Sequence, residues 1–175
     1  SCPVNENLHG LFQPPEPPAL ENVQAEQGIL ASILLRNADF DAVAEILRPE
    51  HFSAKYRGEI YRICGDAIRN GRFADPVTLR SAFHANEAIA EYGPQKAITE
   101  ILTGMMAAPH SLLRNYAAEI VDMATRRGVR AIANSVLWGA NEFEDDTATV
   151  IISRMQDQLQ ALAVGADGTR QAKTA

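Results

Sequence analysis

The side chains best suited to catalysis or metal binding are scattered along this chain of 175 residues. Four histidines, His9, His51, His84 and His110, stand singly, and none is followed three or four residues later by a second histidine or a cysteine. A helix-borne metal site would need that kind of spacing. Cys64 falls on the apolar side of a predicted helix, where a thiol usually packs in the core. We therefore predict no catalytic residue and no metal site.

Nucleotide-binding motifs are absent from the sequence as well. Neither GxxxxGK[ST] nor GxGxxG, the two glycine-rich loops that cradle phosphates, occurs in the chain. The acidic run 142–146 lacks the alternating oxygen ligands of a calcium loop, and it indicates a solvated helix cap instead. We therefore predict no cofactor-binding residue in this segment.

One small basic group could contact nucleic acid. Arg126, Arg127 and Arg130 fall close together on one predicted helix, with Glu119 and Asp122 nearby. The whole chain carries a formal net charge of −6, whereas a free-standing nucleic-acid binder has a basic excess. The three arginines are candidate nucleic-acid contacts, but a solvated helix face is the simpler interpretation.

The composition favours a helical protein. Hydrophobic residues make up 46% of the chain but aromatic residues only 6%, so Ala, Leu, Ile and Val must form most of the core. Cys2 and Cys64 form no CxxC motif, which favours a reducing compartment over a disulfide scaffold. No apolar run approaches the roughly 18 residues of a membrane span, and no signal-peptide pattern is present. We expect a soluble, cytoplasmic, all-α protein with one domain and extensions.

Apolar residues recur every three or four positions from residue 22 onwards, which predicts a bundle of short helices. Residues that begin or end helices separate the segments. These are Asn22 and Asp39 as N-caps, Asn70–Gly71 as a C-terminal stop, Asp75–Pro76 as a restart and Gly93–Pro94 as a break.

The longest periodic segment follows Pro109 and predicts a helix that protrudes from the bundle, alone or in a hairpin. Gly128 interrupts its pattern, which marks either a bend or a close contact between helices. We predict that the apolar stripe of this segment mediates self-association, and that Ile132→Asp disrupts the association while the bundle stays folded. The predicted interface residues are Leu113, Ile120, Ala124, Ile132 and Val136.

A final helix is predicted over residues 147–164, after the acidic run. Its residues Ile151, Met155 and Leu159 lie on one side and are predicted to dock on a partner outside this chain. The chain thus divides into a Pro-rich flexible arm (1–20), a helical domain (21–143), a linker helix (144–164) and a tail (165–175).

An ordered set of short segments runs through the predicted helices. The set comprises Ala25–Gln27, Ile29–Leu30, Leu34–Leu35, Val43–Leu47, His51–Phe52, Ile60–Tyr61, Ile68 with Gly71, Asp75–Leu79 and Tyr116–Val121. Over residues 21–140 this order resembles the N-terminal domain of bacterial replicative DNA helicases of the DnaB type. Residues 147–164 resemble the linker helix that follows the domain in that family. One departure is Arg57, which stands where the family often has His in an FxxxxH pattern.

The resemblance implies a non-catalytic scaffold: a small helical bundle with a protruding helical hairpin, followed by a separate linker helix. In the family, copies of the domain pair into the collar of a hexamer that helps to recruit primase, and the linker helix docks on a neighbouring motor domain. It further implies a motor with ATP and Mg²⁺ that lies C-terminal to Ala175. A helicase loader is a further expected partner, and DNA is contacted through the parent assembly; no membrane contact is expected.

Two alternatives share the helical character. One is the helicase-binding C-terminal domain of a primase, which would follow a polymerase domain and be largely monomeric; the linker-like helix argues against it. The other is a stand-alone helicase loader or adaptor that binds single-stranded DNA through Arg126, Arg127 and Arg130. A small helical enzyme is the least supported reading because no acid–base pair or nucleophile stands out.

Overall fold

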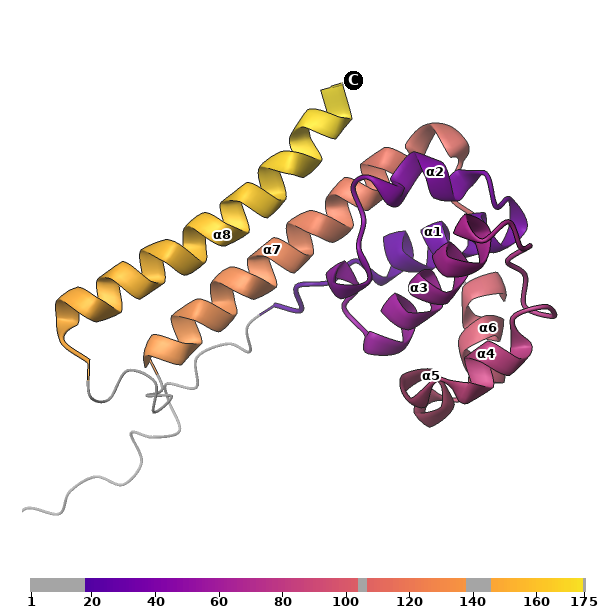
Figure 1. Cartoon of the computed structure of the whole chain (residues 1–175), viewed down its shortest axis with the longest axis horizontal. Coiled ribbons are helices and arrows are strands. Elements are labelled where there is room, and N and C mark those ends of the chain that lie inside the picture. The colour runs from indigo at the N-terminus through magenta and orange to yellow at the C-terminus, as the bar shows by residue number, and fades with distance from the viewer. Residues whose placement is uncertain (1–17, 104–106, 138–145, 175) are drawn as a thin grey trace, which may run out of the picture.

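The structure, a computed structural model, describes residues 18–103, 107–137 and 146–174 (Figure 1). The all-α prediction is confirmed, since these residues form α-helices and short 3-10 helices and contain no strand. The α-helices are α1 (Val23–Leu35), α2 (Asp39–Ala44), α3 (Lys55–Arg69), α4 (Arg80–Ala85), α5 (Glu87–Tyr92), α6 (Pro94–Thr103), α7 (Leu113–Leu137) and α8 (Ala148–Thr174). The 3-10 helices are η2 (Pro49–His51) and η3 (His110–Leu112).

Helices α1 to α6 and the start of α7 form a head, from which the rest of α7 and all of α8 extend (Figure 1). Helix α1 is buried on nearly every side and lies at the centre of the head, in contact with α3, α6 and α7. A helix that is apolar all round belongs in a core rather than at a surface. The core therefore sits between α1 and the helices that surround it.

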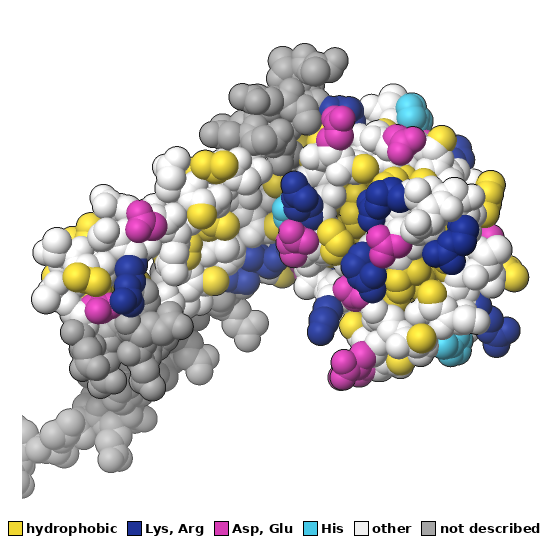
Figure 2. Space-filling model, in the orientation of Figure 1, with side chains coloured by type: hydrophobic (Ala, Val, Ile, Leu, Met, Phe, Trp, Pro, Cys, Tyr) yellow, Lys and Arg dark blue, Asp and Glu magenta, His cyan; other side chains and the backbone are white. Residues whose placement is uncertain are grey.

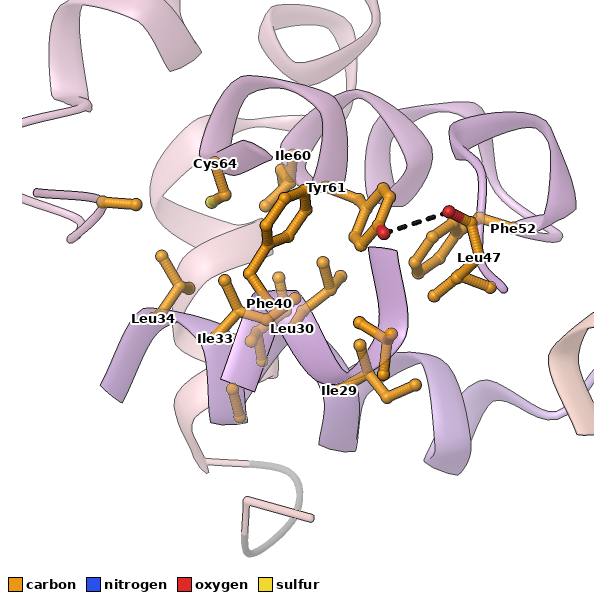
Figure 3. Close-up of a cluster of buried hydrophobic side chains, with 14 of the residues drawn as sticks. Ile29, Leu30, Ile33, Leu34, Phe40, Leu47, Phe52, Ile60, Tyr61 and Cys64 are labelled. Atoms are coloured by element: carbon orange, nitrogen blue, oxygen red, sulfur yellow. Dashed lines mark hydrogen bonds between the residues drawn. The ribbon is translucent and has the colours of Figure 1, made fainter. Parts of the chain in front are cut away.

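Aromatic rings and aliphatic side chains fill this core (Figure 3). The ring of Tyr61 lies 5.5 Å from that of Phe40 and 5.3 Å from that of Phe52, between their centroids. Its hydroxyl donates a hydrogen bond of 3.0 Å to the carbonyl oxygen of Leu47, drawn as the dashed line in Figure 3. Burial raises the pKa of Tyr61, so the hydroxyl stays protonated and keeps this bond.

Several helix boundaries lie where the sequence places them. The Asn22 side chain accepts a hydrogen bond of 3.0 Å from the amide of Ala25 and so caps α1. Gly71, with φ of +68°, follows α3, and Gly93, with φ of +103°, separates α5 from α6. Both glycines adopt a left-handed backbone that a side chain would disfavour.

Two predicted N-caps act differently in the structure. Asp39 does not cap α2; its buried carboxylate instead accepts hydrogen bonds from the Ser32 and Arg36 side chains. Asp75 does bind the amides of Val77 and Thr78, at 2.8 and 3.1 Å, but these residues form a turn. Helix α4 begins only at Arg80, because the capped segment serves as a tight connection rather than a first helical turn.

Helices α7 and α8 lie side by side and run antiparallel, forming a hairpin that projects from the head (Figure 1). The protruding hairpin is thus present, but its second arm is the helix that the sequence suggested as a separate linker. A tail over 165–175 is wrong for the described residues, because α8 continues to Thr174.

Candidate interaction surface

The predicted self-association residues do not share one environment. Leu113 and Ile120 are fully buried in the head, where α7 packs against α1 and α2. Their helical spacing therefore reflects the core of the domain itself, and neither side chain is accessible to another protein. This corrects their placement on an interaction surface.

Ala124, Ile132 and Val136 are half-buried and lie beyond the head on α7. They share four-residue spacing with Gly128, where a Cβ atom would come within 2.8 Å of Leu162 Cδ2 on α8. The same stripe of α7 therefore faces α8, and Gly128 marks a close helix–helix contact rather than a bend. Ile151 and Met155 of α8 are half-buried as well. Most of the residues predicted for self-association or docking thus lie on the facing stripes of α7 and α8. We call the contact between these two stripes the seam of the hairpin.

Other apolar side chains of the hairpin are left exposed. Figure 2 shows apolar side chains along the visible face of the hairpin, with few charged ones between them. Ile152 is 56% exposed and Val129 is 46% exposed. Each follows a residue of the seam, Ile151 or Gly128, by one position, so in the antiparallel hairpin both lie on the same side of the seam. Leu159 comes seven residues after Ile152 and shares its face of α8. We call Val129, Ile152 and Leu159 the outer apolar surface.

The three candidate nucleic-acid arginines already have partners within the chain. Arg126 forms an exposed ion pair of 2.6 Å with Asp122. Arg127 donates to the carbonyl oxygens of Leu20 and His51, each at 2.6 Å. Arg130 donates at 3.2 Å to the carbonyl of Pro18. Arg127 and Arg130 therefore tether the segment before α1 to the hairpin helix α7.

A buried ion pair joins α1 to α3 in the head. Arg57 Nε lies 2.6 Å from Glu26 Oε2, and both side chains are almost inaccessible to solvent. Ser53 and Tyr56 complete the network, since Arg57 also donates to both of their hydroxyl oxygens at 2.8 Å. Burial alone would lower the pKa of Arg57, but the Glu26 carboxylate outweighs it and raises the pKa. The Arg57 guanidinium is therefore charged, and all three of its nitrogens are bonded within the head.

A second polar cluster fixes the segment that leads into α7. His110 Nδ1 lies 2.8 Å from Asp39 Oδ1, and Arg36 donates at 3.1 Å to the carbonyl of Ala108. The amide of Ala108 also donates at 3.1 Å to the carbonyl of Gly28 in α1. These contacts hold residues 108–110 against α1 and α2, and so set the direction in which α7 leaves the head.

The residues considered for chemistry are dispersed. In the described part of the chain, no three His, Cys, Asp or Glu side chains come together in a way that could hold a metal ion. Cys64 is buried, and burial raises the pKa of its thiol to about 12, as expected of a core thiol. His51 and His110 each bond within the head, whereas His9 lies outside the described residues. No helix among the described residues is long and apolar enough to span a membrane.

A sequence model of the DnaB-like helicase N-terminal domain matches residues 18–122, which is more than half of the chain. The chain belongs to this family.

Individual relatives agree with the assignment. The replicative DNA helicase DnaB of Rickettsia prowazekii is 31% identical over 119 residues, which cover 68% of this chain and 24% of that protein. The chain therefore spans about a quarter of this relative. The crystal structure of the N-terminal domain of DnaB helicase from Mycobacterium tuberculosis superposes with a TM-score of 0.69. That match covers 82% of this chain and 99% of the other at 22% identity, and it establishes the shared fold.

Within this DnaB-type domain, sequence reasoning missed the polar contacts that position the helices. Glu26 and Arg57 lie 31 residues apart in sequence, and Asp39 and His110 lie 71 apart. Periodicity reports which residues face inward, but it does not report which distant residues meet. One signal was available: Glu26 shares its helix face with Ile29 and Leu30, three and four residues later, and a charged residue buried on such a face requires a partner.

Proposed function

We propose that this segment is the self-association and primase-docking part of a replicative DNA helicase and has no catalytic activity of its own. The parent protein would be a cytoplasmic, ATP-dependent helicase whose motor, with ATP and Mg²⁺, follows this segment. Family membership supports the setting in DNA replication. The outer apolar surface of the hairpin is the observation that carries the self-association.

The seam between α7 and α8 is filled by residues of this chain, so a second molecule that pairs through the hairpin would contact its outer apolar surface rather than the seam. Burying a fully exposed Val, Leu or Ile contributes roughly 1.5–3 kcal/mol. Val129, Ile152 and Leu159 are 40–56% exposed, so burying them on each of two copies could offset several kcal/mol of the cost of association. A two-fold pair would place the same residues of both hairpins in contact.

Aspartate at the centre of this surface tests the proposal. We expect Ile152→Asp and Val129→Asp to reduce chemical cross-linking of the chain to itself, because a charge would have to be buried at the interface. Leu35→Asp is the matched control, since Leu35 is 63% exposed but lies on α1 in the head. Equal loss of cross-linking in the control, or no loss in either hairpin variant, would refute the hairpin as the pairing surface. The earlier choice, Ile132→Asp, is unsuitable because Ile132 is half-buried on the stripe that faces α8.

Primase docking rests on the family resemblance and needs its own test. Calorimetric titration of this chain with the primase of the same organism should give saturable heat. A heat signal no larger than that of dilution would contradict primase docking and leave self-association unaffected. A helicase loader can be titrated in the same way.

The adaptor alternative makes a different prediction. Binding of single-stranded DNA by the isolated chain, weakened by salt and by neutralising Arg126, Arg127 and Arg130, would favour it. The structure offers it no support, because all three guanidinium groups already bind groups of the same chain.

A further inference from the structure

The head carries a second apolar feature, remote from the hairpin in sequence. A groove with a volume of about 400 Å³ lies between α4 and α6. Phe83 is fully buried at its base, while Val77, which is 82% exposed, stands at its rim. The groove is lined by Pro76, Val77, Arg80, Phe83, His84, Pro94, Gln95, Ile98 and Leu102.

The charge of this groove is one-sided. Arg80 and His84 lie four residues apart on α4 and therefore on the same face of the helix. No Asp or Glu lines the groove, and neither side chain has an ion-pair partner in the described part of the chain. Arg62 and Arg69, by contrast, are paired with carboxylates of α3. Arg80 thus presents a positive charge that the head itself does not neutralise, with the polar imidazole of His84 on the same helix face.

We propose that this groove binds an acidic amphipathic helix from a partner protein. An apolar stripe at three- and four-residue spacing would cover Val77, Ile98 and Leu102, and carboxylates beside that stripe would pair with Arg80 and accept a hydrogen bond from His84. Helix α6 has ten residues and is about 15 Å long, so the groove accommodates roughly three turns of such a helix. The proposal is independent of self-association through the hairpin, because the two surfaces share no residue.

Two synthetic peptides and the ¹⁵N-labelled chain provide the test. The first is a 14-residue helical peptide (~21 Å long) with Leu in one stripe, Glu on both sides of the stripe and Ala elsewhere. The second replaces every Glu with Lys.

We expect the acidic peptide to shift the amide signals of Val77, Phe83 and Leu102. The Lys peptide and the Arg80→Glu/His84→Glu double variant should each weaken binding by about tenfold or more, because they remove the charge complementarity. Arg72→Glu, an exposed charge reversal outside the groove, is the control and should bind like the wild type.

Other occupants give distinct results, and each would overturn the proposal. Equal binding of both peptides, or no shift at the groove, would show that charge does not select a ligand there. Groove signals that move when the chain alone is diluted would assign the groove to a second copy. Groove signals that move when residues 1–17 are removed would assign it to the N-terminal segment of the same chain. The double variant should keep the solution mass of the wild type, so failure of this proposal and failure of self-association are distinguishable.

Discussion

Arg57 shows how one substitution at a core position is accommodated. It stands where related domains often carry His, five residues after Phe52, and such a side chain cannot be buried without a counter-charge. Glu26 supplies that charge from α1, and the hydroxyl oxygens of Ser53 and Tyr56 accept hydrogen bonds from the other two guanidinium nitrogens. The departure from the family pattern therefore has a physical explanation within this chain.

We predict that removing one partner of this pair is far more harmful than removing both. Glu26→Gln or Arg57→Gln should lower the free energy of unfolding by about 3–5 kcal/mol, because an unpaired charge stays buried. Glu26→Leu combined with Arg57→Met should lie close to the wild type, because apolar residues of similar volume replace a fully desolvated pair. Urea unfolding of the three variants measures the difference. Additive losses in the double variant would contradict the account.

Asp39 has a comparable role at the segment before α7. Burial alone would raise its pKa, but hydrogen bonds from Ser32, His110 and Arg36 outweigh it, so the pKa lies below the usual value of 3.8. The folded state therefore binds the proton less tightly than the unfolded state. Its contribution to stability is present above pH 3.8 and is lost as the pH falls through the lowered pKa.

Replacing Asp39 with Asn should reveal this dependence. At pH 7 we expect a loss of about 1–3 kcal/mol in the free energy of unfolding, because an amide cannot accept all the bonds that the carboxylate accepts. The difference from the wild type should shrink as the pH is lowered below about 4, because the carboxylate of the unfolded chain takes up its proton there and that of the folded chain only at lower pH. Chemical unfolding at a series of pH values tests this. A difference that stays constant down to pH 2 would argue against a charged Asp39.

At the scale of elements, the hairpin depends on the close approach of its arms at Gly128. A Cβ atom there would lie 2.8 and 2.9 Å from the two Cδ atoms of Leu162, whereas a Cβ at Gly165 would meet nothing within 4 Å. Both glycines lie inside helices of the same hairpin. They therefore form a matched pair that separates packing from helix propensity.

We predict opposite effects of leucine at these two positions. Gly128→Leu should push α7 and α8 apart and speed amide hydrogen exchange along α8, because the side chain has no room at the seam. Gly165→Leu should leave exchange unchanged or slow it, since Leu is the better helix former by about 0.8 kcal/mol. Faster exchange in the Gly165 variant alone would place the contact elsewhere.

Local signals predicted the helices well, and long-range pairing limited the rest. Asn22, Asn70–Gly71 and Gly93 act at helix ends through their own backbone or side chains, so sequence alone could locate those boundaries. Helix α5 was not foreseen as a separate helix, because only Asn86 separates it from α4. The apolar stripes of α7 and α8 were visible, but the sequence could not show that they face each other. A stripe indicates that a partner exists, not whether the partner belongs to the same chain.

At the scale of the whole molecule, the head and the hairpin are held together by more than the continuous helix α7. Arg127 binds the carbonyls of both Leu20 and His51, so it links the segment before α1, the 3-10 helix η2 and α7 at one point. Residues 18–20, the end of the predicted arm over 1–20, are thus attached to α7. These contacts fix the direction of the hairpin relative to the head, as self-association through the hairpin requires.

The self-association of the hairpin is the central claim, and the solution mass of the 175-residue chain tests it most directly. Sedimentation velocity over a hundredfold range of concentration should show a species of twice the chain mass or larger, and Ile152→Asp should return it to a single chain. A wild-type chain that stays a single molecule at every concentration would contradict the account. The outer apolar surface would then await a different partner.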